Sequence, residues 1–376
     1  METVVVVGAG PGGLAVAAAL KAVGIDALVI DRASSVGSTW RGHYDRLHLH
    51  TARRFSALPG LPIPSSYGQW VSRDNVVRYL EDYTRHHALR LKLGVAVEGL
   101  SRLGTGWRLA TAGGAIDAGR VVIATGYNHT PLLPDWPGRD GFRGELLHAS
   151  RYKNASPYRG RDVLVVGAGN TGAEIAVDLV EGGASRVRLS IRTPPNILTR
   201  TLGPIPAQAI GIVLSKLPTK LVDPVVALAQ KYAVGDLSQY GLPPAPRGAY
   251  SQVVNDGQIP ILDVGLIDAV KRGKVEVVKA VERFEDKAVV LADGTRMSPD
   301  VVIAATGYRR GLESLVGHLG LVDKRGRPVV HGPVTHPSAP GLHFVGYTNP
   351  ASGNLRELAI DARKIARVCK RAAVAA

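Results

Sequence analysis

The sequence has only one cysteine, Cys369, among its 376 residues. A single thiol cannot form an internal disulfide, a CxxC redox pair or a cysteine-rich metal site, so catalysis through an internal dithiol is excluded and no metal site is expected. Aromatic residues are also few, and they do not cluster with the basic residues. Because no run of five or more basic residues occurs, the net charge of +15 does not indicate a nucleic-acid partner. A dispersed positive charge suits phosphate-rich cofactors or an acidic substrate equally well.

Long uninterrupted apolar runs are missing as well. Residues 3–20 carry no charge and approach the length of a transmembrane helix, but Pro11 and four glycines interrupt them. No basic segment precedes them, as a signal peptide would require. We therefore predict no transmembrane segment and a cytoplasmic protein.

Glycine, in contrast, is abundant, with 44 residues, and the sequence repeats itself at long range. Val6–Gly10 recurs as Val165–Gly169, and Val121–Tyr127 recurs with one added alanine as Val301–Tyr308. Each half therefore opens with an apolar strand and a glycine turn, and each contains a strand that ends in Ala-Thr-Gly-Tyr. The length suggests two or three domains, and the repeat predicts an α/β fold with two Rossmann-type dinucleotide-binding units.

The first glycine turn matches the dinucleotide-binding pattern GxGxxG at Gly8, Gly10 and Gly13, and Asp31 follows 18 residues after the last glycine. The glycines permit a tight turn, the approach of a pyrophosphate and close packing of helix on strand. The helix N-terminus attracts the phosphates. Asp31 can accept hydrogen bonds from both ribose hydroxyls and disfavours a 2′-phosphate, so this turn suits FAD or NAD. The alternative is an ordinary strand–turn–helix without a cofactor.

The second glycine turn repeats the pattern at Gly167, Gly169 and Gly172. The strand after it ends without an acid, and Arg192 stands 20 residues after Gly172. A guanidinium at this place pairs with a 2′-phosphate, so the second turn suits NADP. A solvated surface arginine is the alternative for Arg192. Together the two turns indicate FAD in the first site and NADPH in the second, with electrons passing from NADPH to the flavin.

A third motif precedes the second turn. Phe142, Gly144, His148 and Tyr152 fit the spacing F-x-G-x-x-x-H-x-x-x-Y. This constellation resembles the identifying sequence of the class B flavin-dependent monooxygenases, and within that class the chain is similar to the YUCCA-type enzymes. Tyr152 departs from the tryptophan that is usual in Baeyer–Villiger members, which argues against lactone formation. The other stretches that carry the similarity are Trp40, Tyr44–His50, Tyr240–Leu242 and Ile259–Gly265.

The resemblance implies a monooxygenase in which NADPH reduces FAD, O₂ adds at flavin C4a, and the resulting (hydro)peroxyflavin oxygenates a small organic substrate. N- or S-oxygenation and oxidative decarboxylation of an aryl 2-oxo acid, such as indole-3-pyruvate, are both open. The alternatives are an NADPH oxidase or flavin-dependent reductase that oxygenates no substrate, and Baeyer–Villiger oxygenation. A disulfide reductase shares the two-dinucleotide plan but needs a second cysteine. A nucleotide-sensing protein without turnover would leave the third motif unexplained.

We predict that the NADPH-binding domain, residues 156–299, is inserted in the FAD-binding domain, residues 1–155 and 300–376. A lid-like segment is expected at about 200–250. Its apolar, proline-broken part, Thr201–Val234, would form irregular helices that cover the site or touch lipid, or else an ordinary buried subdomain. The expected partners are a small-molecule substrate and O₂, with a homodimer left open.

The two sets of cofactor contacts follow from the motifs. No catalytic residue stands out; His50 and Asn170 are candidates, and His50 could instead be a hydrogen-bonded structural histidine. The two Thr-Gly pairs are expected at the crossings between the domains. The expected FAD contacts are Gly8, Gly10, Pro11, Gly12, Gly13, Asp31, Arg32, Thr39, Trp40, His48, Thr125, Gly126 and Gly346. The expected NADP contacts are Gly167, Gly169, Asn170, Thr171, Gly172, Ser190, Arg192, Thr306 and Gly307.

Overall fold

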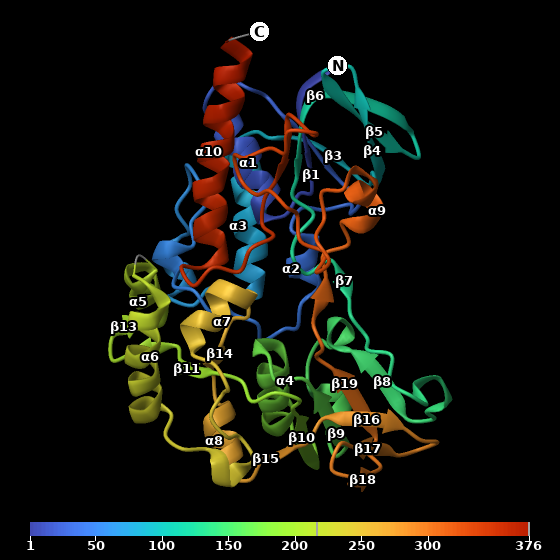
Figure 1. Ribbon diagram of the computed structural model, residues 1–376, viewed down its shortest axis with the longest axis vertical. Coiled ribbons are helices and arrows are strands. Elements are labelled where there is room, and N and C mark those ends of the chain that lie inside the picture. The colour runs from blue at the N-terminus through green and yellow to red at the C-terminus, as the bar shows by residue number, and fades with distance from the viewer. Residues whose placement is uncertain (216, 375–376) are drawn as a thin grey trace.

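The computed structural model describes residues 1–215 and 217–374. It consists of two sheet-and-helix units stacked along the long axis of the molecule (Figure 1). The upper unit in the figure contains both termini, and the lower unit contains the middle of the chain. The predicted α/β class is confirmed.

The sheet of the upper unit has the order β3-β2-β1-β6-β5-β4, with β21 also paired to β6. Strands β3, β2, β1, β6 and β21 are parallel, and β4–β5–β6 is an antiparallel meander. The run of valines in β1 is completely buried, as the β-branched sequence predicts for a central parallel strand. The strands are β1 (Glu2–Val7), β2 (Leu28–Asp31), β3 (Arg90–Leu93), β4 (Val97–Leu103), β5 (Gly106–Thr111), β6 (Gly114–Ile123) and β21 (Leu342–Phe344).

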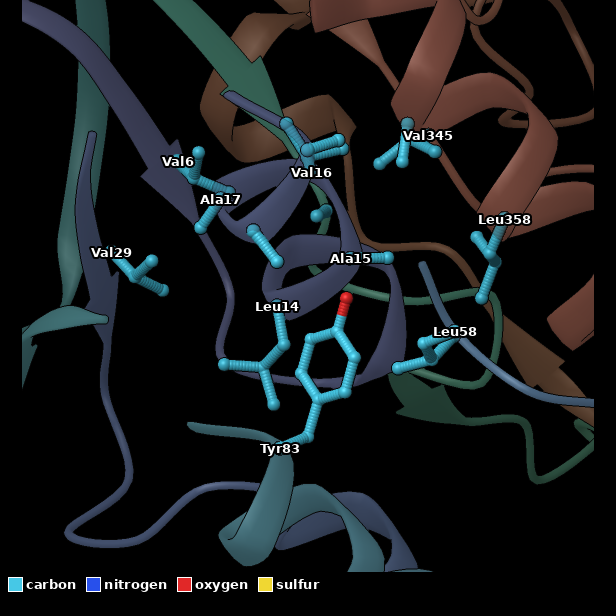
Figure 2. Close-up of a cluster of buried hydrophobic side chains, with 14 of the residues drawn as sticks. Val6, Leu14, Ala15, Val16, Ala17, Val29, Leu58, Tyr83, Val345 and Leu358 are labelled. Atoms are coloured by element: carbon cyan, nitrogen blue, oxygen red, sulfur yellow. The ribbon is translucent and has the colours of Figure 1, made fainter. Parts of the chain in front are cut away.

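Helix α1 (Pro11–Lys21) leaves the first glycine turn and is buried along most of its length. It packs against the C-terminal helix α10 (Asn354–Val374) and against α3 (Arg73–His86). Figure 2 shows Leu14 of α1 beside the ring of Tyr83, whose hydroxyl donates to the Pro59 carbonyl at 2.6 Å. This apolar packing holds the glycine turn rigidly at the end of β1. Two short helices complete the unit: α2 (Ser38–Gly42) and α9 (Glu313–Val316).

The sheet of the lower unit has the order β15-β10-β9-β19-β8, and all its pairings are parallel. Helices α4 and α8 pack beside it, and a small antiparallel sheet is inserted in the chain between β15 and β19. The elements are β8 (Glu145–His148), β9 (Asp162–Val166), α4 (Asn170–Glu181), β10 (Arg186–Ser190), α8 (Leu266–Lys271), β15 (Val275–Val278), β16 (Val281–Phe284), β17 (Val289–Leu291), β18 (Arg296–Met297) and β19 (Val301–Ala304).

Strands β8 and β19 belong to the lower sheet, although the predicted boundaries at 155 and 300 assign them to the FAD-binding domain. The reason is that each Ala-Thr-Gly-Tyr strand lies beside the glycine-turn strand of its own unit: β6 beside β1, and β19 beside β9. The chain crosses between the units only after these strands end. The crossing segments pair with one another as the antiparallel strands β7 (Thr130–Pro131) and β20 (Tyr308–Arg309).

The predicted lid-like segment forms a small subdomain on the side of the molecule. Its helices α5 and α6 lie at the left edge of Figure 1, away from both sheets. Many of its apolar side chains are exposed, so the expectation of a buried subdomain is wrong. Within the described residues, no helix is both long and apolar enough to cross a membrane. The elements are β11 (Ile197–Thr199), β12 (Thr201–Leu202), β13 (Ile205–Pro206), α5 (Ala207–Leu214), α6 (Thr219–Ala233), α7 (Ala249–Asp256) and β14 (Ile261–Asp263).

Candidate functional site

A cavity of about 480 Å³ opens at the carboxyl end of the upper sheet, within the usual size range of cofactor and ligand sites. It collects residues from the glycine turn, the end of β2, helix α2, the 47–51 segment, the end of β6 and the start of α10. His50 also lines it. Gly13 is the one predicted FAD contact that does not. The predicted contacts that line it are Gly8, Gly10, Pro11, Gly12, Asp31, Arg32, Thr39, Trp40, His48, Thr125, Gly126 and Gly346.

The three motif glycines of the first turn have different roles. Gly8 has a φ of +117°, and a Cβ on it would lie 2.4 Å from the Ala124 carbonyl oxygen. A Cβ on Gly13 would lie 1.8 Å from the Gly8 carbonyl oxygen. Gly8 and Gly13 are therefore needed because any side chain there would clash with the protein backbone. A Cβ on Gly10 would meet nothing within 4 Å, so Gly10 faces open space at the N-terminus of α1.

The second turn is a geometric copy of the first. Gly167 has a φ of +112°, and its Cβ would lie 2.6 Å from the Ala305 carbonyl oxygen. A Cβ on Gly172 would lie 1.9 Å from the Gly167 carbonyl oxygen, whereas one on Gly169 would meet nothing. Thr171 follows in the first turn of α4. The sequence repeat thus reproduces the same cradle at two helix N-termini.

The ends of the second strands differ in charge, as predicted. The carboxylate of Asp31 accepts from the backbone N–H groups of Ala9 at 2.6 Å and Ala33 at 2.8 Å. This fixes the carboxylate beside the first turn. Arg192 is exposed beside the second turn.

Strand register corrects one detail of the predicted equivalence. Ile30 pairs with the residue before the first turn, and Ser190 pairs with the residue before the second. The position of Asp31 is therefore taken by Ile191, which is buried, and Arg192 stands one residue further on. The Ser190 side chain is also turned inward, because its hydroxyl donates to the Lys279 carbonyl at 2.8 Å.

The two crossings between the units are anchored by different partners. The Thr125 hydroxyl lies 2.7 Å from the hydroxyl of Tyr347, which follows the predicted FAD contact Gly346. The Thr306 hydroxyl donates to the Leu132 carbonyl on the other crossing segment. Gly126 and Gly307 have φ values of +93° and +87°, so glycine is required where each strand turns away.

The third motif lies at the second crossing. The Ser150 N–H donates to Nδ1 of His148 at 3.1 Å, so Nε2 carries the proton and donates to the Gly307 carbonyl at 3.0 Å. Burial lowers the pKa of His148, which favours the neutral imidazole. The Tyr308 ring lies edge-on to the imidazole. His148 therefore holds the crossing in place.

The other motif residues pack the lower unit. The buried Tyr152 hydroxyl donates to Asp178 of α4 at 2.5 Å, and its ring stacks on Tyr158. The Phe142 ring folds over Gly144, where a Cβ would lie 2.4 Å from it. A side chain at position 144 would therefore have to displace the Phe142 ring.

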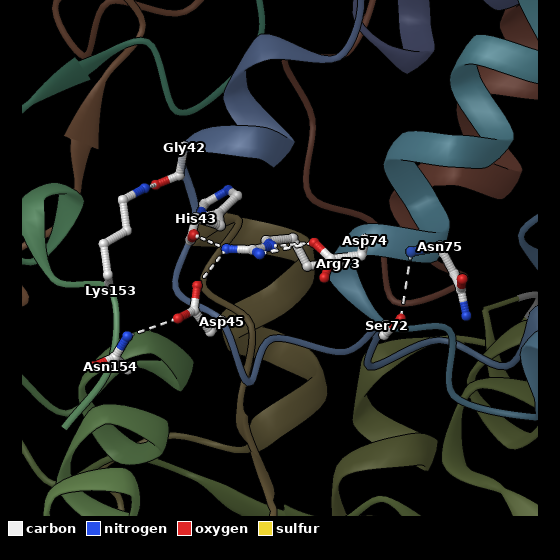
Figure 3. A network of polar contacts seen from close by, with 9 residues as sticks. All are labelled: Gly42, His43, Asp45, Ser72, Arg73, Asp74, Asn75, Lys153 and Asn154. Atoms are coloured by element: carbon white, nitrogen blue, oxygen red, sulfur yellow. Dashed lines mark hydrogen bonds and ion pairs between the residues drawn. The ribbon is translucent and has the colours of Figure 1, made fainter. Parts of the chain in front are cut away.

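The segment from Trp40 to His50 joins the two units. Tyr44 and Leu47 pack into the core of the lower unit, whereas Leu49 packs into that of the upper unit. Figure 3 shows the polar network that holds this segment. Arg73 of α3 donates to Asp45 at 2.7 Å, and Asp45 in turn accepts from the Asn154 amide at 2.8 Å.

A buried acid–base pair lies where the units meet. Nε2 of His50, on the cavity wall, is 2.6 Å from Oε1 of Glu174 on α4, and this carboxylate is only 3% exposed. Nδ1 of His50 is buried and has no hydrogen-bond partner among the described residues. Burial and the neighbouring Glu174 carboxylate raise the pKa of Tyr44 well above its usual value. The pair therefore connects the first cavity to the helix of the second turn.

Asn170 is bound to the protein through both ends of its amide. Its Nδ2 donates to the Pro260 carbonyl at 3.0 Å, and its Oδ1 accepts from the Leu262 N–H at 2.8 Å. It ties the second turn to β14, inside the stretch Ile259–Gly265. Each polar atom of the Asn170 amide thus makes one hydrogen bond to the backbone.

Arg200 is a further cation in this region, and no sequence motif predicts a role for it. Its guanidinium carbon lies 4.7 Å from the centre of the Trp70 ring, and its Nε is buried without a hydrogen-bond partner among the described residues. Burial lowers the pKa of Arg200, and the charge of Glu174 opposes this effect. The Glu174 carboxylate contacts His50 rather than Arg200. Arg200 is therefore available to an anionic ligand.

Comparison with known proteins agrees with this geometry. Residues 5–203 match the family model described as pyridine nucleotide-disulphide oxidoreductase. The chain is 37% identical to indole-3-pyruvate monooxygenase YUCCA1 of Oryza sativa subsp. japonica over 350 residues, which cover 92% of this chain and 86% of the relative. Cys369 is buried in α10, so the disulphide chemistry in the family description has no dithiol here.

Solved structures share the whole architecture. A mutant flavin monooxygenase from Stenotrophomonas maltophilia superposes with a TM-score of 0.76 at 25% identity, covering 99% of this chain and 100% of that one. OTEMO, solved in complex with FAD and NADP, superposes with a TM-score of 0.74 at 18% identity, covering 100% of this chain and 85% of that one. The predicted fold class, with two Rossmann-type domains, is confirmed.

Proposed function

The chain belongs to the YUCCA-like family of flavin-containing monooxygenases, and from that premise we propose that it uses FAD, NADPH and O₂ to decarboxylate an aryl 2-oxo acid oxidatively. It is a flavin-dependent monooxygenase; the cofactor contacts, the substrate class and the reaction type are the proposal. The single observation that supports the substrate class is the Arg200 guanidinium, which forms no salt bridge within residues 1–215 and 217–374.

We assign FAD to the 480 Å³ cavity. The open space at Gly10 accommodates the pyrophosphate at the N-terminus of α1, and Asp31 accepts from the ribose. Bound and reduced, the flavin supplies the electrons that activate O₂. The protein orients the cofactor and excludes water through the apolar packing of α1 and α10.

We assign NADPH to the second turn. Gly169 offers the same open space to the pyrophosphate at the N-terminus of α4, and the exposed Arg192 pairs with the 2′-phosphate. Asn170 positions this turn rather than reacting.

We assign the substrate carboxylate to Arg200. A carboxylate can form two parallel hydrogen bonds with a guanidinium, and Trp70 holds that guanidinium by stacking. The overall reaction balances: the 2-oxo acid, O₂, NADPH and a proton give the carboxylic acid shorter by one carbon, CO₂, NADP⁺ and water. Nε2 of His50 and Oε1 of Glu174, 2.6 Å apart, would lie at the edge of this site.

The proposal is tested with purified FAD-loaded protein supplied with NADPH, O₂ and indole-3-pyruvate. We expect one equivalent of indole-3-acetate and of CO₂ for each NADPH consumed. Peroxide release in proportion to NADPH, with the substrate left intact, would establish the oxidase alternative. Oxygenation of thioethers or amines but not of the 2-oxo acid would keep the monooxygenase class and reject the substrate assignment. An ester product would indicate the Baeyer–Villiger reaction.

A further inference from the structure

Exposed apolar side chains are concentrated on the side subdomain. Of the fourteen large apolar residues that are exposed in the described part of the chain, eight lie between residues 202 and 232. A monomeric protein seldom leaves a contiguous apolar patch in water without a use for it. The patch lies on α5, α6 and the β12–β13 hairpin, at the left edge of Figure 1.

The outer face of α6 is a regular apolar stripe. Leu221, Val225, Leu228 and Tyr232 follow one another at intervals of four, three and four residues, which places them on one side of a helix. Their exposures are 63%, 58%, 56% and 84%. Val213 and Leu217 continue the exposed apolar surface towards α5. We call these six residues the docking face.

The inner face of α6 is firmly attached, so the outward stripe is not an accident of a loose helix. Val222 is buried, and the Asp223 carboxylate accepts from the backbone N–H groups of Tyr250 and Ser251 at 2.9 and 3.1 Å. The Gln230 amide donates to the Ile197 carbonyl at 3.0 Å. Rotation of α6 to bury its stripe would break all of these contacts.

The charges around the docking face are positive. Lys220 and Lys231 are exposed at the two ends of α6, and Asp223, the one acid among residues 207–215 and 217–233, is turned inward. A second copy of the chain could meet this face through a two-fold axis. The lysines of the two copies would then face one another, and two chains of net charge +15 would repel. A surface rich in anionic lipid headgroups complements both the apolar stripe and the lysines.

We propose that the docking face binds peripherally to anionic lipid bilayers, with α6 lying in the plane of the interface. The long axis of α6 and its even stripe suit a shallow position at the boundary between headgroups and acyl chains. The same subdomain carries Arg200, which stacks on Trp70, and Gln208 of α5 joins it to the upper unit through the Ala52 N–H and the Ser352 carbonyl, each at 2.8 Å. Binding through the docking face would therefore bring the subdomain that carries Arg200 to the membrane surface.

The test is flotation of the FAD-loaded protein with vesicles of phosphatidylcholine alone or with about 30% phosphatidylglycerol. We expect about tenfold more protein on the anionic vesicles, and most of it released by about 0.5 M NaCl. The triple variant Leu221→Ser, Val225→Ser, Leu228→Ser should bind at least about tenfold more weakly. The variant Lys220→Gln, Lys231→Gln should lose the preference for anionic vesicles.

The matched control replaces exposed valines elsewhere, Val329→Ser and Val334→Ser, which are 49% and 59% exposed. It should float like the wild type. NADPH oxidation and melting temperature should be unchanged in every variant, because none of these residues lies at the cofactor cavity. Absence of wild-type flotation, or equal flotation of the triple variant, would overturn the proposal. A wild-type dimer that becomes monomeric in the triple variant would assign the face to a second copy instead.

Discussion

A substitution at Gly10 tests cofactor binding without disturbing the fold. Its backbone has ordinary extended angles and a Cβ there would touch no protein atom, so Gly10→Val should fold normally but obstruct a pyrophosphate at the α1 N-terminus. We expect colourless protein with a melting temperature near that of wild type, measured by flavin absorbance and thermal unfolding. Gly169→Val is the matched control, and it should remain yellow. A yellow Gly10→Val protein would contradict the FAD assignment.

Gly8 should behave differently from Gly10. Its φ is positive and a Cβ would lie against the Ala124 carbonyl, so Gly8→Ala strains the fold itself by more than about 1 kcal/mol. Loss of flavin in this variant would therefore carry no information about the cofactor.

Arg192 decides between NADPH and NADH in our assignment. Arg192→Ala should raise the KM for NADPH by about tenfold to a hundredfold, because it removes a charge-assisted hydrogen bond, and should leave the KM for NADH unchanged. Steady-state kinetics with both cofactors measure this. Arg159→Ala, at another exposed arginine of the chain, is the control. An unchanged NADPH/NADH ratio would show that Arg192 is a solvated surface residue.

Arg200 is expected to select acidic substrates. Arg200→Gln should raise the KM for an aryl 2-oxo acid by at least about tenfold, since the bond to the carboxylate is lost, with a smaller effect on kcat. Oxidation of a neutral thioether, if the wild type supports it, should not change. Arg200→Lys keeps the positive charge but cannot form two parallel hydrogen bonds with a carboxylate. Its KM for the 2-oxo acid should lie between those of the wild type and of Arg200→Gln. Equal losses for acid and thioether would mean that Arg200 only supports the fold.

At the scale of elements, the crossing between the units depends on the end of β8. His148→Ala removes the hydrogen bond to the Gly307 carbonyl and the contact with Tyr308, which should lower the melting temperature by a few degrees. Product formed per NADPH should also fall, because β19, which leads into this crossing, lies beside β9, which leads into the second turn, while substrate preference stays the same. His148→Gln retains a donor and should recover part of both. Wild-type stability and coupling in His148→Ala would contradict this role.

For the whole molecule, stability should decrease in mild acid. Burial lowers the pKa of His43 and of His343 to about 4, below their unfolded value of 6.5. Between pH 6.5 and 4 the unfolded chain takes up protons that the folded protein does not, so each histidine destabilises the fold by about 1.4 kcal/mol per pH unit. Chemical denaturation from pH 7 to 4 measures the slope, and His343→Gln should flatten it. An unchanged slope would exclude His343 as a contributor.

The two glycine turns and their difference in charge can be predicted without the fold. These features are local, because a strand, a glycine turn and a helix need only neighbouring residues. The positive φ of Gly8 and Gly167, and the close approach of Gly13 and Gly172 to their carbonyl groups, arise within one turn. The presence of a single cysteine likewise excludes dithiol chemistry, whatever the fold.

The contacts that join those turns to the rest of the protein become visible only in the folded chain. The pairing of His50 with Glu174, the stacking of Arg200 on Trp70 and the inclusion of β8 and β19 in the lower sheet all depend on residues far apart in the chain. The same holds for the outward direction of the α6 stripe, since a helical period shows which residues share a face but not whether that face meets a core or solvent. Short-range sterics are encoded locally, whereas partners across the fold are set by how the two units pack.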